Sequence, residues 1–141
     1  MGRGVKLALT LIISATAFCA RINAQVQDNL VLFWNLENFF DWTDGGNGDS
    51  DTEFTPGGKR HWTARKFYLK CNAVAKSVLW ISDEYGKLPD VIGLAEIENR
   101  GVLSKLINYT SLRKTGYKIV HYDSPDHRGI DVALLWNTGT M

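Results

Sequence analysis

Cysteine, proline and histidine are scarce in this chain of 141 residues, which contains two cysteines, three prolines and three histidines. One cysteine, Cys19, lies in an apolar N-terminal run, so removal of that run would leave Cys71 as the only cysteine. No intramolecular disulfide could then form, even in an oxidising compartment. The histidines lie in different segments, and no two of them have the spacing of zinc ligands. The fold must therefore rest on packing, and the sequence indicates no zinc site.

A strong excess of charge of either sign is also absent. The chain has 16 Lys and Arg residues against 15 Asp and Glu residues, which makes a formal net charge of +1. Proteins that bind nucleic acid mainly through the phosphate backbone normally carry a large basic excess. The composition therefore argues against tight, purely electrostatic binding to a nucleic-acid duplex.

The one long apolar run, LALTLIISATAFCA, follows two basic residues near the N-terminus. It is too short to span a bilayer comfortably, and it predicts a secretory signal peptide over residues 1–24 with cleavage after Ala24. Lipid attachment at Cys19 is less favoured because a bulky residue precedes it, and an anchor that is never cleaved stays open. We expect an exported protein, periplasmic or extracellular, with no stable membrane span once the signal is removed. Removing 24 of the 141 residues leaves 117, enough for one domain with a modest core.

The hydrophobic pattern of the remaining chain predicts four strands and two helices in the order β, α, β, α, β, β. The strands are expected at 29–35, 90–97, 117–123 and 130–136, and the helices at 64–81 and 101–113. Residues 36–62 are rich in glycine and acids without periodicity, which indicates a long loop. The first strand, helix and strand favour a right-handed crossover between parallel neighbours. We expect one mixed sheet with helices on one face and an apolar opposite face that needs a cover.

Polar residues follow two of the predicted buried strands at the points where these strands end. Asn35 ends the first strand, and Glu96 follows the apolar run 91–95. If the strands are parallel neighbours, an amide and a carboxylate meet at one edge, which suits a hard cation such as Mg²⁺. The simpler interpretation is that Glu96 is a solvated strand end or caps the following turn with Asn99. Spacing alone favours that simpler interpretation.

Three segments change this balance because together they resemble a known family. VLFWNLENFFD at 31–41, PDVIGLAEIEN at 89–99 and HRGIDVALLW at 127–136 are similar, in order and spacing, to motifs of the endonuclease/exonuclease/phosphatase superfamily. The second motif is the most specific, since the family's corresponding strand ends in a metal-binding glutamate, which Glu96 matches. Asn35 matches the asparagine that ends the family's first strand. Ala95 is a departure, because many relatives carry glutamine there.

The resemblance implies an α/β (α+β) fold, in which residues 25–141 form the N-terminal portion of a four-layered αββα sandwich. The family's later motifs, one with an aspartate and an asparagine and one with the catalytic histidine, are not found in this sequence. We therefore expect a truncated domain, inactive by itself. A missing C-terminal half, or a partner, is expected to cover the open sheet face.

The chemistry implied by the resemblance is metal-dependent hydrolysis of a phosphoester. Glu96 would bind the cation, Mg²⁺ or another divalent ion such as Mn²⁺ or Ca²⁺, and Asn35 would steady the cation or a phosphate oxygen. Asn38 and Arg128 could donate hydrogen bonds to the phosphate. Asn38 could instead stabilise its loop, and Asp131 is as well placed to be a structural hydrogen-bond acceptor as a ligand.

For Arg128, the alternative to phosphate binding is a turn residue paired with Asp123 or Asp126. The expected substrate is a phosphodiester or a phosphomonoester, with nucleic acid among the candidates, and the expected activity is nuclease-like. The alternative from a different class is a catalytically inactive fragment or interaction module that needs a partner.

Overall fold

The computed structural model describes residues 28–45 and 48–140, so the predicted signal peptide at 1–24 lies outside the described residues. Four strands form one sheet in the order β1-β2-β4-β3. Their bounds are β1 Val31–Phe39, β2 Val91–Ile97, β3 Tyr117–His121 and β4 Asp131–Asn137. β1 and β2 are parallel, whereas β4 is antiparallel to both β2 and β3. The predicted mixed sheet and its parallel first pair are confirmed.

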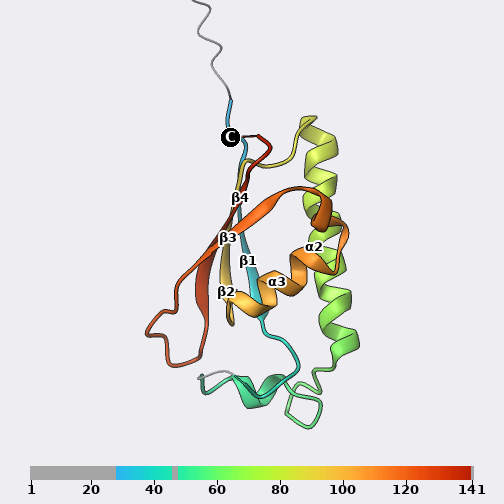
Figure 1. Cartoon of the computed structure of the whole chain (residues 1–141). Coiled ribbons are helices and arrows are strands. Elements are labelled where there is room, and N and C mark those ends of the chain that lie inside the picture. The colour runs from blue at the N-terminus through green and yellow to red at the C-terminus, as the bar shows by residue number, and fades with distance from the viewer. Residues whose placement is uncertain (1–27, 46–47, 141) are drawn as a thin grey trace, which may run out of the picture.

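Two helices, α2 (Ala64–Tyr85) and α3 (Arg100–Asn108), lie on the same face of the sheet (Figure 1). Each begins where a side chain caps it, because Thr63 accepts from the Lys66 N–H and Asn99 accepts from the Val102 N–H. Their apolar stripes pack on the inner face of the sheet. Fully buried members of this core are Phe39, Phe67, Cys71, Ile92, Ile97, Val102, Leu103, Leu106 and Leu112. Within the described ranges, no helix is long and apolar enough to cross a membrane.

Element boundaries differ from the predictions in two helices. α2 continues past the predicted end at residue 81 and stops at Gly86, which has a φ of 69°. The predicted helix 101–113 is two elements, α3 and a short 3₁₀ helix at Ser111–Lys114. Thr110 separates them because its hydroxyl donates to the Leu106 carbonyl and accepts from the Leu112 N–H.

The first strand also extends further than predicted, since β1 runs four residues beyond Asn35 to Phe39. The loop after β1 contains one 3₁₀ turn, Asp51–Phe54. Phe54 stacks on Phe40 with ring centroids 4.5 Å apart, which anchors this loop against the end of the sheet. The loop is therefore packed at its base.

The opposite face of the sheet is apolar and open. Phe33 is 70% exposed, Val132 is 66% exposed and Leu134 is 47% exposed. These side chains alternate with partly buried ones along β1 and with buried ones along β4, as expected for strands with one covered face. No helix or strand of the described residues covers this face (Figure 1). The expected half-sandwich, with helices on one face only, is confirmed.

Candidate functional site

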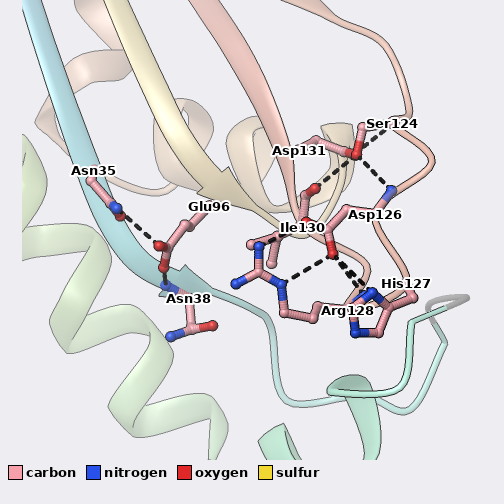
Figure 2. A network of polar contacts seen from close by, with 9 residues as sticks. All are labelled: Asn35, Asn38, Glu96, Ser124, Asp126, His127, Arg128, Ile130 and Asp131. Atoms are coloured by element: carbon pink, nitrogen blue, oxygen red, sulfur yellow. Dashed lines mark hydrogen bonds and ion pairs between the residues drawn. The ribbon is translucent and has the colours of Figure 1, made fainter.

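Asn35, in the middle of β1, and Glu96, next to the last residue of β2, lie side by side where the pairing of the two strands is interrupted, so the prediction that Asn35 ends the first strand is wrong. The two strands are in parallel register, with Asn35 opposite Ala95, so the residue after Ala95 lies beside Asn35. The Asn35 Nδ2 donates a hydrogen bond of 2.9 Å to the Glu96 Oε1 (Figure 2). Glu96 is half-buried, so solvent and small ligands can reach its carboxylate.

The backbone at this junction is strained. Glu37, Asn38 and Glu96 have positive φ angles of 52°, 59° and 60°. The pairing of β2 with β1 and its pairing with β4 are both interrupted at Glu96, between Ala95 and Ile97. A left-handed residue with a side chain costs about 1–2 kcal/mol, and such strain persists where surrounding contacts hold it in place. The interrupted strand directs the Glu96 side chain toward the end of β1.

The surrounding N–H groups orient the Glu96 carboxylate. Its Oε2 accepts from the backbone N–H of Asn38 at 2.9 Å, and its Oε1 accepts from Asn35. The Asn35 Oδ1 accepts from the Glu37 N–H at 2.7 Å, which turns the amide NH₂ group toward Glu96. Each carboxylate oxygen keeps a second lone pair, and Glu96 forms no ion pair within the described ranges. A pre-oriented hard oxygen ligand fits a divalent cation, while Asn35 offers a donor that orients this ligand.

Arg128 lies on the turn between β3 and β4 and is paired with Asp126, one of the two partners considered. Its Nε and Nη2 donate to the two Asp126 carboxylate oxygens at 3.1 and 2.7 Å. This pairing raises the pKa of Arg128, with a smaller contribution from Glu96, and it lowers the pKa of Asp126 to about 2. Figure 2 shows the guanidinium extending from its turn toward the side where Glu96 and Asn38 lie. The structure thus places Arg128 facing the site without a direct bond to Glu96.

Asp131 accepts a hydrogen bond within the protein, as in the first of the two roles considered for it, and the role as a ligand stays a prediction. It is 7% exposed, its Oδ1 accepts from the Ser124 N–H at 2.7 Å, and its Oδ2 lies 2.9 Å from the His121 Nε2. With Asp123 it forms a His–Asp–Asp group whose ligand atoms lie within 4.8 Å of one another. The hydrogen bonds of Asp131 fix the base of the turn that carries Arg128.

Glu98 is a buried acid to which sequence reasoning assigned no role. Its Oε2 accepts from the Asp41 N–H at 2.7 Å, and its Oε1 accepts from the Asn99 Nδ2 at 2.8 Å. Burial, together with repulsion from Asp41 and Asp51, raises the pKa of Glu98 to about 7. Glu98 lines a cavity of about 240 Å³. The available signal was the second acid of the EIEN segment, two residues after Glu96.

Lys70 of α2 also reaches this region, and sequence reasoning missed it. Its Nζ donates to the carbonyl oxygens of Glu37 at 2.8 Å and Asn38 at 3.4 Å. A signal was present, because Lys70 follows Phe67 by three residues and so lies beside the buried stripe of the helix. A cation on that stripe needs polar partners, which the end of β1 supplies.

Comparison with known protein families gives a match over the segment that contains these residues. The family model described as "Endonuclease/Exonuclease/phosphatase family" matches residues 30–141. Searches of curated proteins and of solved structures found no match. The family match covers most of the chain, including Asn35, Glu96 and Arg128. The chain therefore belongs to the endonuclease/exonuclease/phosphatase family.

Proposed function

We propose that this chain belongs to an exported, Mg²⁺-dependent phosphoesterase with nuclease-like activity on phosphodiester bonds, to which it contributes the metal-binding glutamate. Family membership supports phosphoester hydrolysis in general. The observation that carries the finer proposal is the contact of Asn35 and Glu96 where the pairing of two parallel strands is interrupted and N–H groups orient the carboxylate. Export is supported by the apolar run at residues 7–20 behind two basic residues.

In this proposal Glu96 is the metal ligand and Asn35 orients it. A bound Mg²⁺ would neutralise charge on the phosphate and activate a water molecule. Mn²⁺ or Ca²⁺ would find the same oxygen donor. Arg128, held by Asp126, donates to a phosphate oxygen with its remaining N–H groups, and the Asn38 side chain is the second proposed phosphate donor. Asp126 holds the Arg128 guanidinium before substrate arrives, which favours positioning of the phosphate.

The proposed substrate is a phosphodiester, with nucleic acid as the first candidate and a phosphomonoester as the second. The near-neutral net charge argues against binding through a large basic excess, so binding would depend on contacts at the scissile phosphate. Affinity is then expected to depend weakly on salt.

The experiment is a comparison of wild-type full-length protein with Glu96→Gln. Hydrolysis of bis(p-nitrophenyl) phosphate and of plasmid DNA is measured with Mg²⁺, and Mn²⁺ binding is measured separately. Glu96→Gln should lower the rate by about 100-fold or more, because it removes the metal's carboxylate ligand. Glu84→Gln, on the exposed end of α2, is the matched control and should change nothing. Full activity of Glu96→Gln would remove the assignment.

A second candidate function is supported by the open apolar face with Phe33, Val132 and Leu134. In that case the chain is a catalytically inactive interaction module, and its sheet face binds a partner or the other half of a sandwich. Light scattering and the phosphodiesterase assay on the full-length protein separate the two candidates. A monodisperse, active monomer would exclude the second, whereas association without Mg²⁺-dependent activity would favour it.

A further inference from the structure

Lys70 and Glu96 contact opposite sides of one peptide group. The carbonyl oxygen of Glu37 accepts from the Lys70 Nζ at 2.8 Å, and the N–H of Asn38 donates to the Glu96 Oε2 at 2.9 Å. This carbonyl and this N–H belong to the same trans peptide and therefore point in opposite directions. A cation thus lies at the negative end of this peptide dipole and an anion at its positive end.

This arrangement stabilises a backbone conformation that is unfavourable by itself. The peptide joins Glu37 and Asn38, both with left-handed φ angles. Lys70 also donates to the Asn38 carbonyl at 3.4 Å, so it holds both strained residues. Without Lys70, the peptide could rotate toward extended strand geometry, and its N–H would turn away from Glu96. Bonds in such a chain also polarise one another, which strengthens the donor that Glu96 receives.

Holding the Lys70 ammonium in this position costs free energy, because the group is partly removed from water. It is half-buried, and its Nζ lies 5.7 Å from the centroid of the Phe39 ring and 5.8 Å from that of Trp62. It forms no ion pair within the described ranges, so its charge acts on backbone carbonyls and ring faces. A lysine that only covered the helix surface would keep its ammonium in water.

We propose that Lys70 is a positioning residue, which fixes the peptide between Glu37 and Asn38 and through it the carboxylate of Glu96. The proposal rests on the proposed function of Glu96 as a metal ligand. The proposal and simple electrostatics predict opposite changes in cation affinity when Lys70 is replaced. Removing a nearby positive charge should tighten cation binding, whereas loss of positioning should weaken it.

The test measures Mn²⁺ affinity of the full-length protein by electron paramagnetic resonance, beside phosphodiesterase kcat and KM. Lys70→Met should weaken Mn²⁺ binding by about 10- to 100-fold, the range found when groups that orient a metal ligand are lost. Lys70→Arg retains donors for two carbonyls and should recover most of the affinity. Lys76→Met removes an exposed lysine from the same helix and is the control for net charge.

Unchanged or tighter Mn²⁺ binding in a folded Lys70→Met variant would overturn the proposal. If Lys70→Met does not fold, Lys70→Gln decides, because a neutral amide bonds the two carbonyl oxygens more weakly than a charged donor does. Mn²⁺ binding at least about tenfold weaker in Lys70→Gln than in Lys70→Arg supports positioning, and equal binding in these two variants overturns it. Glu96→Gln separates the proposed metal-ligand role of Glu96 from the proposed positioning role of Lys70. Loss of Mn²⁺ binding in Glu96→Gln with normal binding in Lys70→Met rejects only the role of Lys70, while a wild-type protein without Mn²⁺ binding rejects both.

Discussion

The two ends of β2 carry acids in contrasting environments. Asp90, just before the strand, is 1% exposed, and its Oδ2 accepts from the Leu30 N–H at 2.6 Å and from the Lys87 Nζ at 2.8 Å. These bonds, led by that of Lys87, lower the pKa of Asp90 to about 2. Glu96, at the other end, is half-buried, accepts only from neutral N–H groups and has no ion pair within the described ranges. One acid is neutralised by the fold, and the other is left able to bind a cation.

The two ends of β2 also differ in which residues adopt a left-handed backbone conformation. At Gly86, on the side of Asp90, a left-handed conformation is taken by glycine, which adopts it without strain. Near the ends of β1 and β2 the left-handed residues are Glu37, Asn38 and Glu96. Among the residues that the structure describes, the remaining left-handed residue with a side chain is His61, in the loop after β1. Backbone strain is therefore concentrated at the end of β2 that carries Glu96, where polar side chains face solvent. It is avoided at the end that carries Asp90.

The largest expected loss of stability is at the end of β2 that carries Asp90. Asp90→Ala should lower the free energy of unfolding by about 2 kcal/mol, because it leaves the half-buried Leu30 N–H and the partly exposed Lys87 without their acceptor. Urea denaturation measures the loss. Glu96→Gln is the paired variant and should change stability by less than about 1 kcal/mol. Equal costs at the two ends would break the comparison.

The next effect concerns Glu98 and depends on pH. The pKa of this residue is raised from 4.5 to about 7, so the folded state disfavours its ionised form. Its contribution to stability is therefore favourable at low pH and is lost as pH rises from about 4.5 to about 7. Glu98→Gln should be more stable than wild type by about 2–3 kcal/mol at pH 8 and nearly equal at pH 4.5. The same difference at both pH values would contradict the role of burial.

Asp90 provides the opposite pH dependence and hence a control. Its folded pKa is lowered to about 2 from 3.8, so its contribution is present above pH 3.8 and is lost as pH falls toward 2. The two pH windows do not overlap, and unfolding measured from pH 2 to 8 resolves them.

A smaller effect is expected from backbone strain. Glu37→Gly should stabilise the protein by about 0.5–1 kcal/mol, since relief of a left-handed φ exceeds the added entropy of the unfolded chain. Gly86→Ala should destabilise it by about 1 kcal/mol through its φ alone, because no atom lies within 4 Å of the added Cβ. Thermal unfolding of both variants tests the contrast, and destabilisation by Glu37→Gly would indicate that the site is not strained.

The smallest effect on folding is expected at the exposed pair Asp126 and Arg128. Asp126→Asn and Arg128→Ala should leave the urea midpoint unchanged, because exposed ion pairs contribute little to stability. Each should raise the KM of the proposed reaction by about tenfold, and the double variant should be no worse than Arg128→Ala if Asp126 acts through Arg128. Additive effects would assign the two residues separate roles.

Much of this architecture could be predicted from the sequence. Hydrophobic periodicity located all four strands and both helices, and the single crossover placed β1 beside β2, so the meeting of Asn35 and Glu96 followed from strand adjacency. Their roles in metal binding remain predictions. Boundaries were missed where side chains decided them, as at Thr110, which ends α3 by bonding to the backbone.

The sequence by itself determined the order of elements, the open apolar face and the end of the sheet at which polar residues gather, because these depend on periodicity and chain order. Only the tertiary structure decided that a lysine of α2 holds the peptide before Asn38, that Asp126 takes one edge of Arg128, and that Glu98 is buried. Those contacts depend on an interrupted strand register and on how a helix lies against a strand. No local pattern in the sequence encodes either of these.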